Sequence, residues 1–177
     1  MKAVARTAIL LVILVAGCGK PPVEEYMKKG EDAEKAGLWS VALENYQNLL
    51  KDHPGSVLAE NATFNIAAIQ QNNLQNFLAA VDGYRLFVEK YPEAKKAPTA
   101  MFLMGFLYHN ELKNLDSAKA CYERFLATYP AHEMAMSAQF ELQNLGKSPD
   151  EILPKPSVAE TTPSKSGGKA SNKTKKN

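Results

Sequence analysis

Hydrophobic positions recur at helical spacing through the middle of the chain. Within residues 80–91 the apolar side chains fall at i, i+1, i+4, i+7, i+8 and i+11, namely Ala80, Val81, Tyr84, Phe87, Val88 and Tyr91. That spacing places them on one face of a helix, with polar residues opposite. Pro92 follows at once, and proline lacks the backbone N–H that another helical turn requires. The pattern predicts an amphipathic helix that stops before residue 92.

The same pattern occurs three times at a constant interval, which we call the repeat interval. The segments align without a gap and read ALENYQNLLKDHP at 42–54, AVDGYRLFVEKYP at 80–92 and AKACYERFLATYP at 118–130. Each holds an alanine, a tyrosine four positions later and a final proline. The matched residues are Ala42, Ala80 and Ala118, then Tyr46, Tyr84 and Tyr122, then Pro54, Pro92 and Pro130. Such self-similarity is typical of a repeat architecture, in which each copy is one structural unit.

A further apolar helix is expected before each of these segments. Four aromatic residues, Tyr26, Phe64, Phe102 and Phe140, are separated by the same repeat interval. We therefore predict an all-α chain of three helix pairs followed by a capping helix near residues 132–146. A terminal unit of this kind needs a polar outer face, because it closes the exposed end of the core.

Two details refine the predicted boundaries. The separation between Gly105 and Ala118 is one residue longer than the separation between Gly30 and Ala42. We therefore predict one inserted residue in the turn 111–114. Further on, Ser148-Pro149-Asp150-Glu151 has the capping serine, the early proline and the glutamate that open a helix.

The repeated segments resemble the tetratricopeptide repeat (TPR) family. Ala42-x3-Tyr46 with Pro54 fits its second helix, and Met101-x2-Met104-Gly105-x2-Tyr108 has the shape of its first helix. The resemblance covers about residues 23–146 and implies a TPR-like α-solenoid, with the array and its capping helix at 23–153. In that family the first helices line a concave groove that binds a peptide or a partner helix. The implied groove residues are Asn65, Asn72, Asn73, His109 and Asn110, although a merely solvated face is the alternative.

The segment 1–17 has the layout of a signal peptide. Lys2 and Arg6 give a basic start, residues 8–16 are uninterruptedly apolar, and small residues follow. Nine helical residues span about 14 Å, which is well short of the ~30 Å hydrocarbon core of a bilayer. The stretch 1–17 is therefore predicted to be a cleaved signal rather than a transmembrane helix.

The next four-residue motif, Val15-Ala16-Gly17-Cys18, resembles the lipobox of bacterial lipoproteins. The resemblance implies that Cys18 is acylated and becomes the new N-terminus. Residues 18–22 would then consist of the lipidated cysteine and a short linker to the array. Gly19 in place of aspartate implies the outer membrane, facing the periplasm. An ordinary secretory signal with an incidental cysteine is the alternative. With the repeats, the lipobox resembles the TPR lipoprotein of the outer-membrane β-barrel assembly machinery and the repeats of the Tol–Pal coordinator.

Charge is unevenly distributed although the net charge is only +2. Residues 18–153 carry 13 basic and 18 acidic side chains, whereas residues 154–177 carry six lysines and one glutamate. The tail 154–177 has almost no large apolar residue and is predicted to be disordered. Its lysines have the charge to contact an anionic envelope polymer, whereas the absence of interleaved aromatic residues argues against nucleic acid.

No catalytic constellation, cofactor motif or metal-ligand spacing occurs, and His53, His109 and His132 stand far apart. Cys121 is expected to be a buried thiol beside Tyr122. We therefore predict a non-enzymatic, lipid-anchored scaffold that binds protein partners in a bacterial envelope complex, such as outer-membrane protein assembly, secretin or pilus biogenesis, or Tol–Pal-like coordination. The alternative is a structural tether whose basic tail binds the envelope polymer.

Overall fold

The structure is a computed structural model that describes residues 19–152, and all regular secondary structure in that range is helical. The predicted signal peptide 1–17, the predicted acylation site Cys18 and the tail 154–177 lie outside the described residues. No helix between residues 19 and 152 is long and apolar enough to cross a bilayer.

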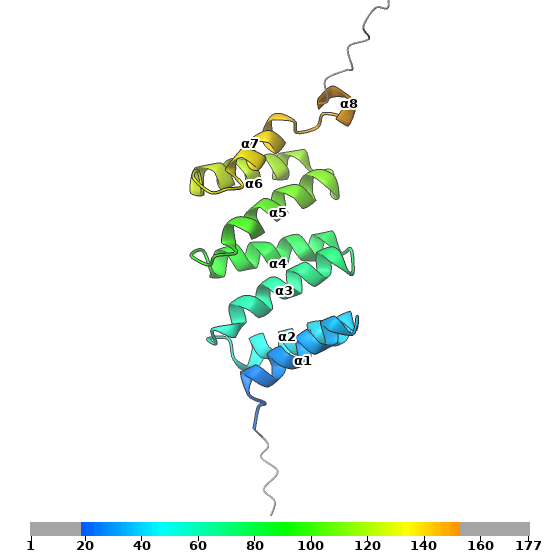
Figure 1. The fold of residues 1–177 in the computed structure, drawn as a ribbon, viewed down its shortest axis with the longest axis vertical. Helices are drawn as coiled ribbons and strands as arrows, with labels where there is room; N and C mark the ends of the chain where they lie inside the picture. The colour runs from blue at the N-terminus through cyan, green and yellow to red at the C-terminus, as the bar shows by residue number, and fades with distance from the viewer. Residues whose placement is uncertain (1–18, 153–177) are drawn as a thin grey trace, which may run out of the picture. The chain divides into compact units, whose positions relative to one another are not determined.

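Seven helices form one compact unit that ends at Gly146, and an eighth short helix belongs to a second unit that begins at Lys147. The helices are α1 Val23–Lys35, α2 Trp39–Asp52, α3 Leu58–Asn72, α4 Phe77–Lys90, α5 Ala97–Asn110, α6 Leu115–Thr128, α7 Ala135–Gln143 and α8 Pro149–Ile152. Within the first unit they stack in chain order from α1 to α7 (Figure 1). The predicted three pairs are α1–α2, α3–α4 and α5–α6, and α7 is the predicted extra helix.

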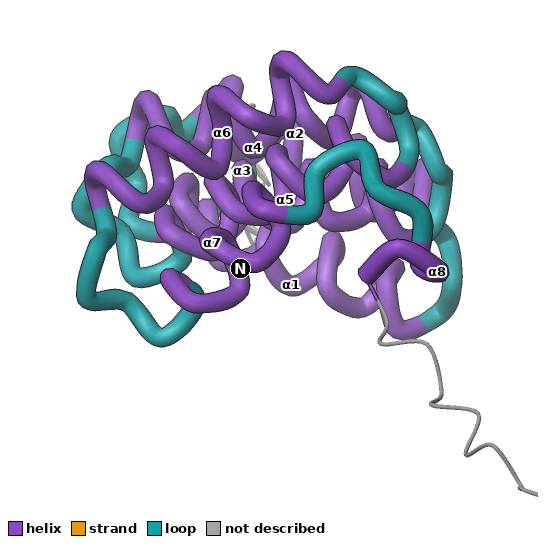
Figure 2. The backbone as a smooth tube through the Cα atoms, turned by 90° about the horizontal axis from the view of Figure 1, so that it is seen from above, coloured by secondary structure: helices purple, strands orange, loops and turns teal. Residues whose placement is uncertain are grey.

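Each helix packs mainly against its neighbours in the chain, and α1 also contacts α3. The second helices of the pairs, α2, α4 and α6, lie along one side of the unit (Figure 2). The first helices, α1, α3, α5 and α7, lie along the other side, and we call this side the first-helix face. The arrangement is an α-solenoid of antiparallel pairs, as the repeat predicted.

The repeated residues form the core, which confirms their assignment from the sequence. Ala42, Ala80 and Ala118 are fully buried, as are the tyrosines four positions later and the residues Leu49, Phe87 and Phe125. Small residues permit close helix crossings, because a Cβ on Gly83 of α4 would stand 2.8 Å from the Cβ of Ala67 on α3. The aromatic rings fill the wider gaps, with Phe64 packed edge-on to Tyr84 and Phe87.

The second helices all end in the same way. His53, Tyr91 and Tyr129 follow the last helical residues with φ between −132° and −127° and ψ between 53° and 59°. Each precedes a proline, which disfavours helical geometry in the residue before it. The geometry of the helix end is therefore repeated at the same interval as the core residues.

The turns inside the pairs differ from the sequence-based expectation. The turn between α1 and α2 has three residues and places Gly37 at φ 71°. The α3–α4 and α5–α6 turns each have four residues, with Gln75 at φ 51° and Lys113 at φ 52°. The extra residue predicted for 111–114 alone is therefore present in two turns, and the first pair is the exception.

The alignment of Tyr26 with Phe64 and Phe102 was wrong by one position. A Cβ on Gly30 or on Gly105 would meet the ring of the tyrosine on the following helix, at 2.4 and 2.7 Å. Gly30 is therefore the counterpart of Gly105, and Met27 is the counterpart of Phe102. The side chain of Tyr26 instead donates a hydrogen bond to Asp52 at 2.8 Å.

The terminal helix α7 does not have the polar outer face predicted for residues 132–146. It buries Ala138 against the preceding pair but leaves Met136 and Phe140 exposed, at 85% and 52% of their surface. Within residues 19–152 no second helix of its own repeat covers Phe140, whereas Phe102, its counterpart one repeat earlier, packs against Tyr122 and Phe125.

The predicted helix start at Ser148 is confirmed within the second unit. Helix α8 begins at Pro149, and the backbone N–H of Ser148 donates to the Glu151 carboxylate at 2.6 Å. The backbone bond satisfies a donor that the first turn of a helix leaves unpaired.

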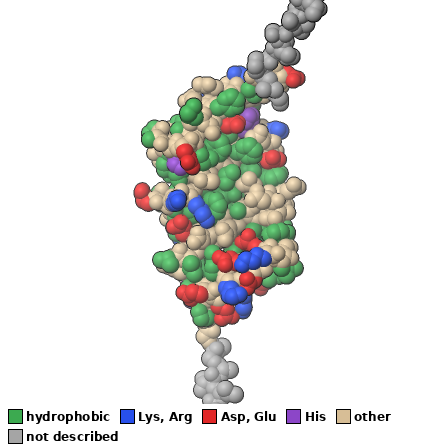
Figure 3. All heavy atoms as spheres, in the orientation of Figure 1, with side chains coloured by type: hydrophobic (Ala, Val, Ile, Leu, Met, Phe, Trp, Pro, Cys, Tyr) green, Lys and Arg blue, Asp and Glu red, His purple; other side chains and the backbone are tan. Residues whose placement is uncertain are grey.

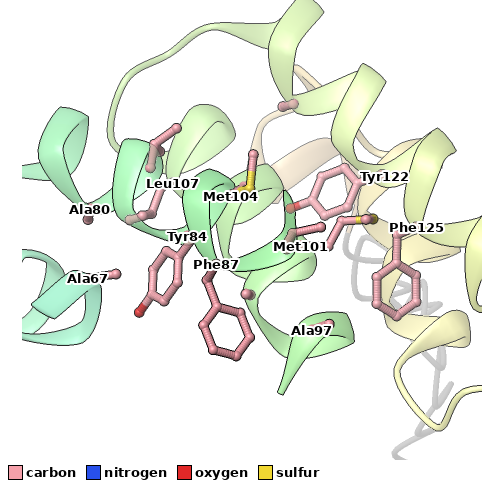
Figure 4. Close-up of a cluster of buried hydrophobic side chains, with 14 of the residues drawn as sticks. Ala67, Ala80, Tyr84, Phe87, Ala97, Met101, Met104, Leu107, Tyr122 and Phe125 are labelled. Atoms are coloured by element: carbon pink, nitrogen blue, oxygen red, sulfur yellow. The ribbon is translucent and has the colours of Figure 1, made fainter. Parts of the chain in front are cut away.

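Buried residues of the first unit form two clusters that meet at α3. The smaller cluster joins α1, α2 and one side of α3, with Tyr46, Leu49 and Ile69 as its large members. The larger cluster begins at Ala67 and continues through α7 to Ala138. Met101 and Met104 of α5 lie at its centre, between Tyr84 of α4 and Tyr122 of α6 (Figure 4).

Candidate functional site

The tyrosines of the second helices bring their hydroxyl groups to polar residues of the first helices. Tyr46 donates to the Glu34 carboxylate on α1 at 2.5 Å and accepts a bond from the Asn65 amide on α3 at 3.3 Å. One buried ring of α2 thus ties two first helices together. Asn65 is therefore part of this network rather than an isolated surface amide.

The second pair repeats the arrangement with another partner. Tyr84 donates to the side-chain oxygen of Gln71 on α3 at 2.8 Å. In the third pair the Tyr122 hydroxyl is buried and has no hydrogen-bond partner within residues 19–152. Burial, followed by the negative charge of Glu141 on α7, raises the pKa of Tyr122. The hydroxyls thus form a row of three, of which the last is unsatisfied.

The remaining predicted groove residues occupy the ends of α3 and α5. Asn72 is the last residue of α3 and Asn73 caps it, and both side chains are exposed. Asn110 is the last residue of α5 and donates to the Phe106 carbonyl at 3.1 Å. His109 lies 3.4 Å from the Glu141 carboxylate and accepts from the Gly146 backbone N–H at 3.5 Å.

These five residues therefore divide into two groups. Asn65 is half-buried within the tyrosine network, whereas the other four stand at the ends of α3 and α5, which the repeat interval matches to each other. Sequence reasoning missed Glu34, Gln71 and Glu141 as members of this polar row. The repeat did contain a signal for one of them, because Gln71 precedes His109 by one repeat interval.

Burial makes the tyrosine row sensitive to high pH. It raises the pKa of Tyr84 to about 12 and raises the pKa of Tyr46 and Tyr122 as well. An unfolded tyrosine titrates near pH 10, so the unfolded state loses its proton first. Stability from Tyr84 is full below pH ~10 and is lost as the pH rises towards about 12.

We therefore expect the urea midpoint of the wild type to fall between pH 10 and about 12, together with the appearance of tyrosinate absorbance. Tyr84→Phe cannot ionise, so its midpoint should fall less steeply over the same range. An identical pH dependence of the two proteins would show that Tyr84 does not contribute.

The residues just before α1 are fastened to the end of α2. Lys20 pairs with the Asp52 carboxylate at 3.2 Å, and the ring of His53 bonds the Pro21 carbonyl at 2.8 Å. The hydrogen bond from Tyr26 and the pairing with Lys20 hold the pKa of Asp52 below its usual value. The segment that follows Cys18 is thus tied to the first helix pair from Lys20 onward.

Charged side chains gather over α1 at the lower end of the view in Figure 3. They pair along the helix, with Lys29 bonded to Glu25 at 2.7 Å and Lys28 to Asp32. Exposed pairs of this kind add little stability. No group of three or more histidine, cysteine, aspartate or glutamate side chains within the described range is placed to hold a metal ion.

Helix pairs that stack in chain order and bury a repeated Ala-x3-Tyr motif are the features of the tetratricopeptide class. Solved structures that are similar to the chain include two with the following extents of match. The TPR domain of Arabidopsis OM64 is 22% identical with a TM-score of 0.52, and the match covers 69% of this chain and 94% of that one. The MamA protein is 16% identical with a TM-score of 0.38, over 73% of this chain and 85% of the other. The first of these supports the TPR fold.

Residues 20–147 match the YfiO family, which is described as outer membrane lipoproteins, and the chain belongs to that family. No curated protein matches the sequence. Together, fold and family identify the chain as a protein-interaction scaffold of the TPR type.

Proposed function

We propose that the chain is anchored to the outer membrane through acyl groups on Cys18 and holds a partner protein in an envelope complex on its first-helix face. The observation that carries the binding role is the row of tyrosine hydroxyls with their amide and carboxylate partners. Hydrogen bonds to the tyrosine hydroxyls fix the side chains of Asn65 and Gln71, so that these polar groups are already ordered before a partner binds. Preorganised groups bind with less loss of conformational entropy.

The exposed amides at the helix ends would form the hydrogen bonds to the partner. Asn72 and Asn73 are exposed, and each offers both a donor and an acceptor to the backbone of an extended peptide. Envelope processes that need such a scaffold include outer-membrane protein assembly, secretin or pilus biogenesis, and Tol–Pal-like coordination.

Site-specific photo-crosslinking in the native envelope tests the first-helix face. A photoreactive amino acid at Asn72, Asn73 or Asn110 is expected to trap one envelope protein. The matched control is Gln47, which is exposed like Asn72 and Asn73 but lies on the second helix α2. A chain without residues 154–177 should give the same product, because the three crosslinking positions and the tyrosine row all lie before residue 147. Crosslinks that form at Gln47 and not at the three asparagines would contradict the proposal.

The anchor is tested separately by Cys18→Ser. Two or three acyl chains hold a protein at a membrane almost permanently, because each buried methylene contributes about 0.8 kcal/mol. We expect the variant to lack the acyl mass and to leave the membrane fraction on washing, while Cys121→Ser remains membrane-bound. Unchanged mass and unchanged membrane association of Cys18→Ser would exclude lipidation.

A further inference from the structure

A cavity of about 240 Å³ opens between α4, α5 and α6, and its lining contains none of the residues proposed for the first-helix face. Its apolar floor is made of Val88, Met101 and Met104, which are all buried. Sites for whole small molecules run from roughly 300 to 1,000 Å³, so this cavity suits a part of a ligand, such as one side chain. Methionine thioethers are flexible and polarisable, which lets such a floor adapt to different apolar groups.

The charged side chains that line this cavity are both arginines. Arg85 is held in place because its guanidinium donates to Asp82 at 2.8 Å and to the Tyr108 hydroxyl at 2.7 Å. Arg124 is exposed and makes no hydrogen bond or ion pair with any residue between 19 and 152. No carboxylate of the described part of the chain lines the cavity, and Asp82 offsets only one of the two positive charges.

The Tyr108 hydroxyl adds a donor beside the arginines. Its oxygen accepts the bond from Arg85, which leaves its own proton available for an incoming acceptor. Carboxylates bind guanidinium groups through short, charge-assisted hydrogen bonds. The rim of the cavity is therefore complementary to a carboxylate, whereas the floor is complementary to an aliphatic or aromatic group.

Cys121 of α6 completes the wall. It is half-buried rather than fully buried as the sequence predicted, and it faces the cavity beside Ala120. Burial raises the pKa of its thiol despite the opposing effect of both arginines, so the group is neutral at pH 7. It contributes soft apolar surface rather than a competing negative charge.

We propose that this cavity is a second protein-binding site, which takes a partner peptide with a large apolar side chain directly beside an aspartate or glutamate. The apolar side chain rests on Met101 and Met104, and the carboxylate bonds Arg124 and the Arg85–Tyr108 pair. The site goes beyond the proposed function, because none of the proposed groove residues lines it and it does not depend on those residues or on the anchor.

Methyl NMR of the full chain, purified from membranes with ¹³C-methyl methionine, tests this proposal. The probes are acetylated, amidated hexapeptides in which leucine, phenylalanine or methionine stands directly before or after aspartate or glutamate. We expect the signals of Met101 and Met104 to shift with at least one acidic peptide, while those of Met27 and Met136 stay unchanged. The same peptides with asparagine or glutamine in place of the acid should bind about tenfold more weakly, the equivalent of one moderate charge contact.

Two charge reversals on α6 serve as a matched pair. Arg124→Glu should weaken binding of the acidic peptides at least tenfold, whereas Lys119→Glu, on the same helix but outside the cavity, should not. The proposal is overturned if no peptide shifts Met101 or Met104, or if the neutral peptides bind equally well. It is also overturned if decanoate shifts both methionines and the peptides do not, since the cavity would then be a site for an anionic lipid.

Discussion

Phe87→Ala is expected to lower the free energy of unfolding by about 3–5 kcal/mol, the range for removing a buried phenylalanine. The ring is fully buried in α4 and contacts Phe64 of α3 at 5.3 Å and Tyr91 at 5.5 Å between ring centroids. Its loss leaves a cavity that rigid neighbouring helices cannot fill. Because α4 packs against α3 of its own pair and against α5 of the third pair, the damage reaches the middle of the array.

Urea unfolding followed by circular dichroism measures this effect. The control is Leu86→Ala, which removes the neighbouring side chain on the same helix but at a position that is 50% exposed. A surface substitution of that kind usually changes stability by no more than about 0.5 kcal/mol. Similar losses for the two variants would show that burial of Phe87 is not what stabilises α4.

Gly105→Leu is expected to destabilise the protein by about 3 kcal/mol, at the upper end for an overpacked core. Even a Cβ at this position would lie 2.7 Å from the ring of Tyr122, and that ring is itself fully buried and cannot move aside. A leucine also improves the helical preference of α5, but this gain is at most about 1 kcal/mol. The close approach of α5 and α6 therefore outweighs it.

The same substitution at Gly55 is the matched control. Gly55 lies in the turn between α2 and α3, where a Cβ would meet nothing within 4 Å. Its replacement by leucine should leave the midpoint of urea unfolding nearly unchanged. If Gly105→Leu were as stable as Gly55→Leu, the helices α5 and α6 would not be in the close contact that the structure shows.

The sequence predicted the second helices best, because their pattern is repeated without change. Alanine, tyrosine and proline recur at the same places, and each is fixed by a physical need: a close crossing, a filled gap or a helix end. The first helices follow no such fixed pattern. Gly30, Ala67 and Gly105 fill the same place in the three pairs, and only the structure shows that each faces the next helix.

The alignment error at Tyr26 has its cause in the turns. A strictly constant repeat interval assumes turns of equal length, but the first turn is one residue shorter. It reverses through Gly37, whereas Gln75 and Lys113 adopt positive φ without being glycine. Each of these is followed by an asparagine that caps the next helix, Asn76 or Asn114, and this local chemistry compensates for the strained residue.

The candidate site was harder to predict than the fold. Asn65 was named from the family pattern, but its bond to Tyr46 depends on a ring that reaches across from α2. Such contacts join residues 12 to 19 positions apart, as for Glu34 and Asn65 with Tyr46. The cavity beside Cys121 requires three helices at once, so no single stretch of sequence reveals it.

The division of the core into two clusters has a mechanical consequence. The residues that lead from Cys18 are fastened to the first helix pair through Lys20 and Pro21, and that pair belongs to the smaller cluster. A pulling force applied at the N-terminal end therefore loads the smaller cluster first. The α1–α2 pair would unfold at a lower force than the rest, and its extended chain would lengthen the segment that follows Cys18 while the larger cluster stayed folded.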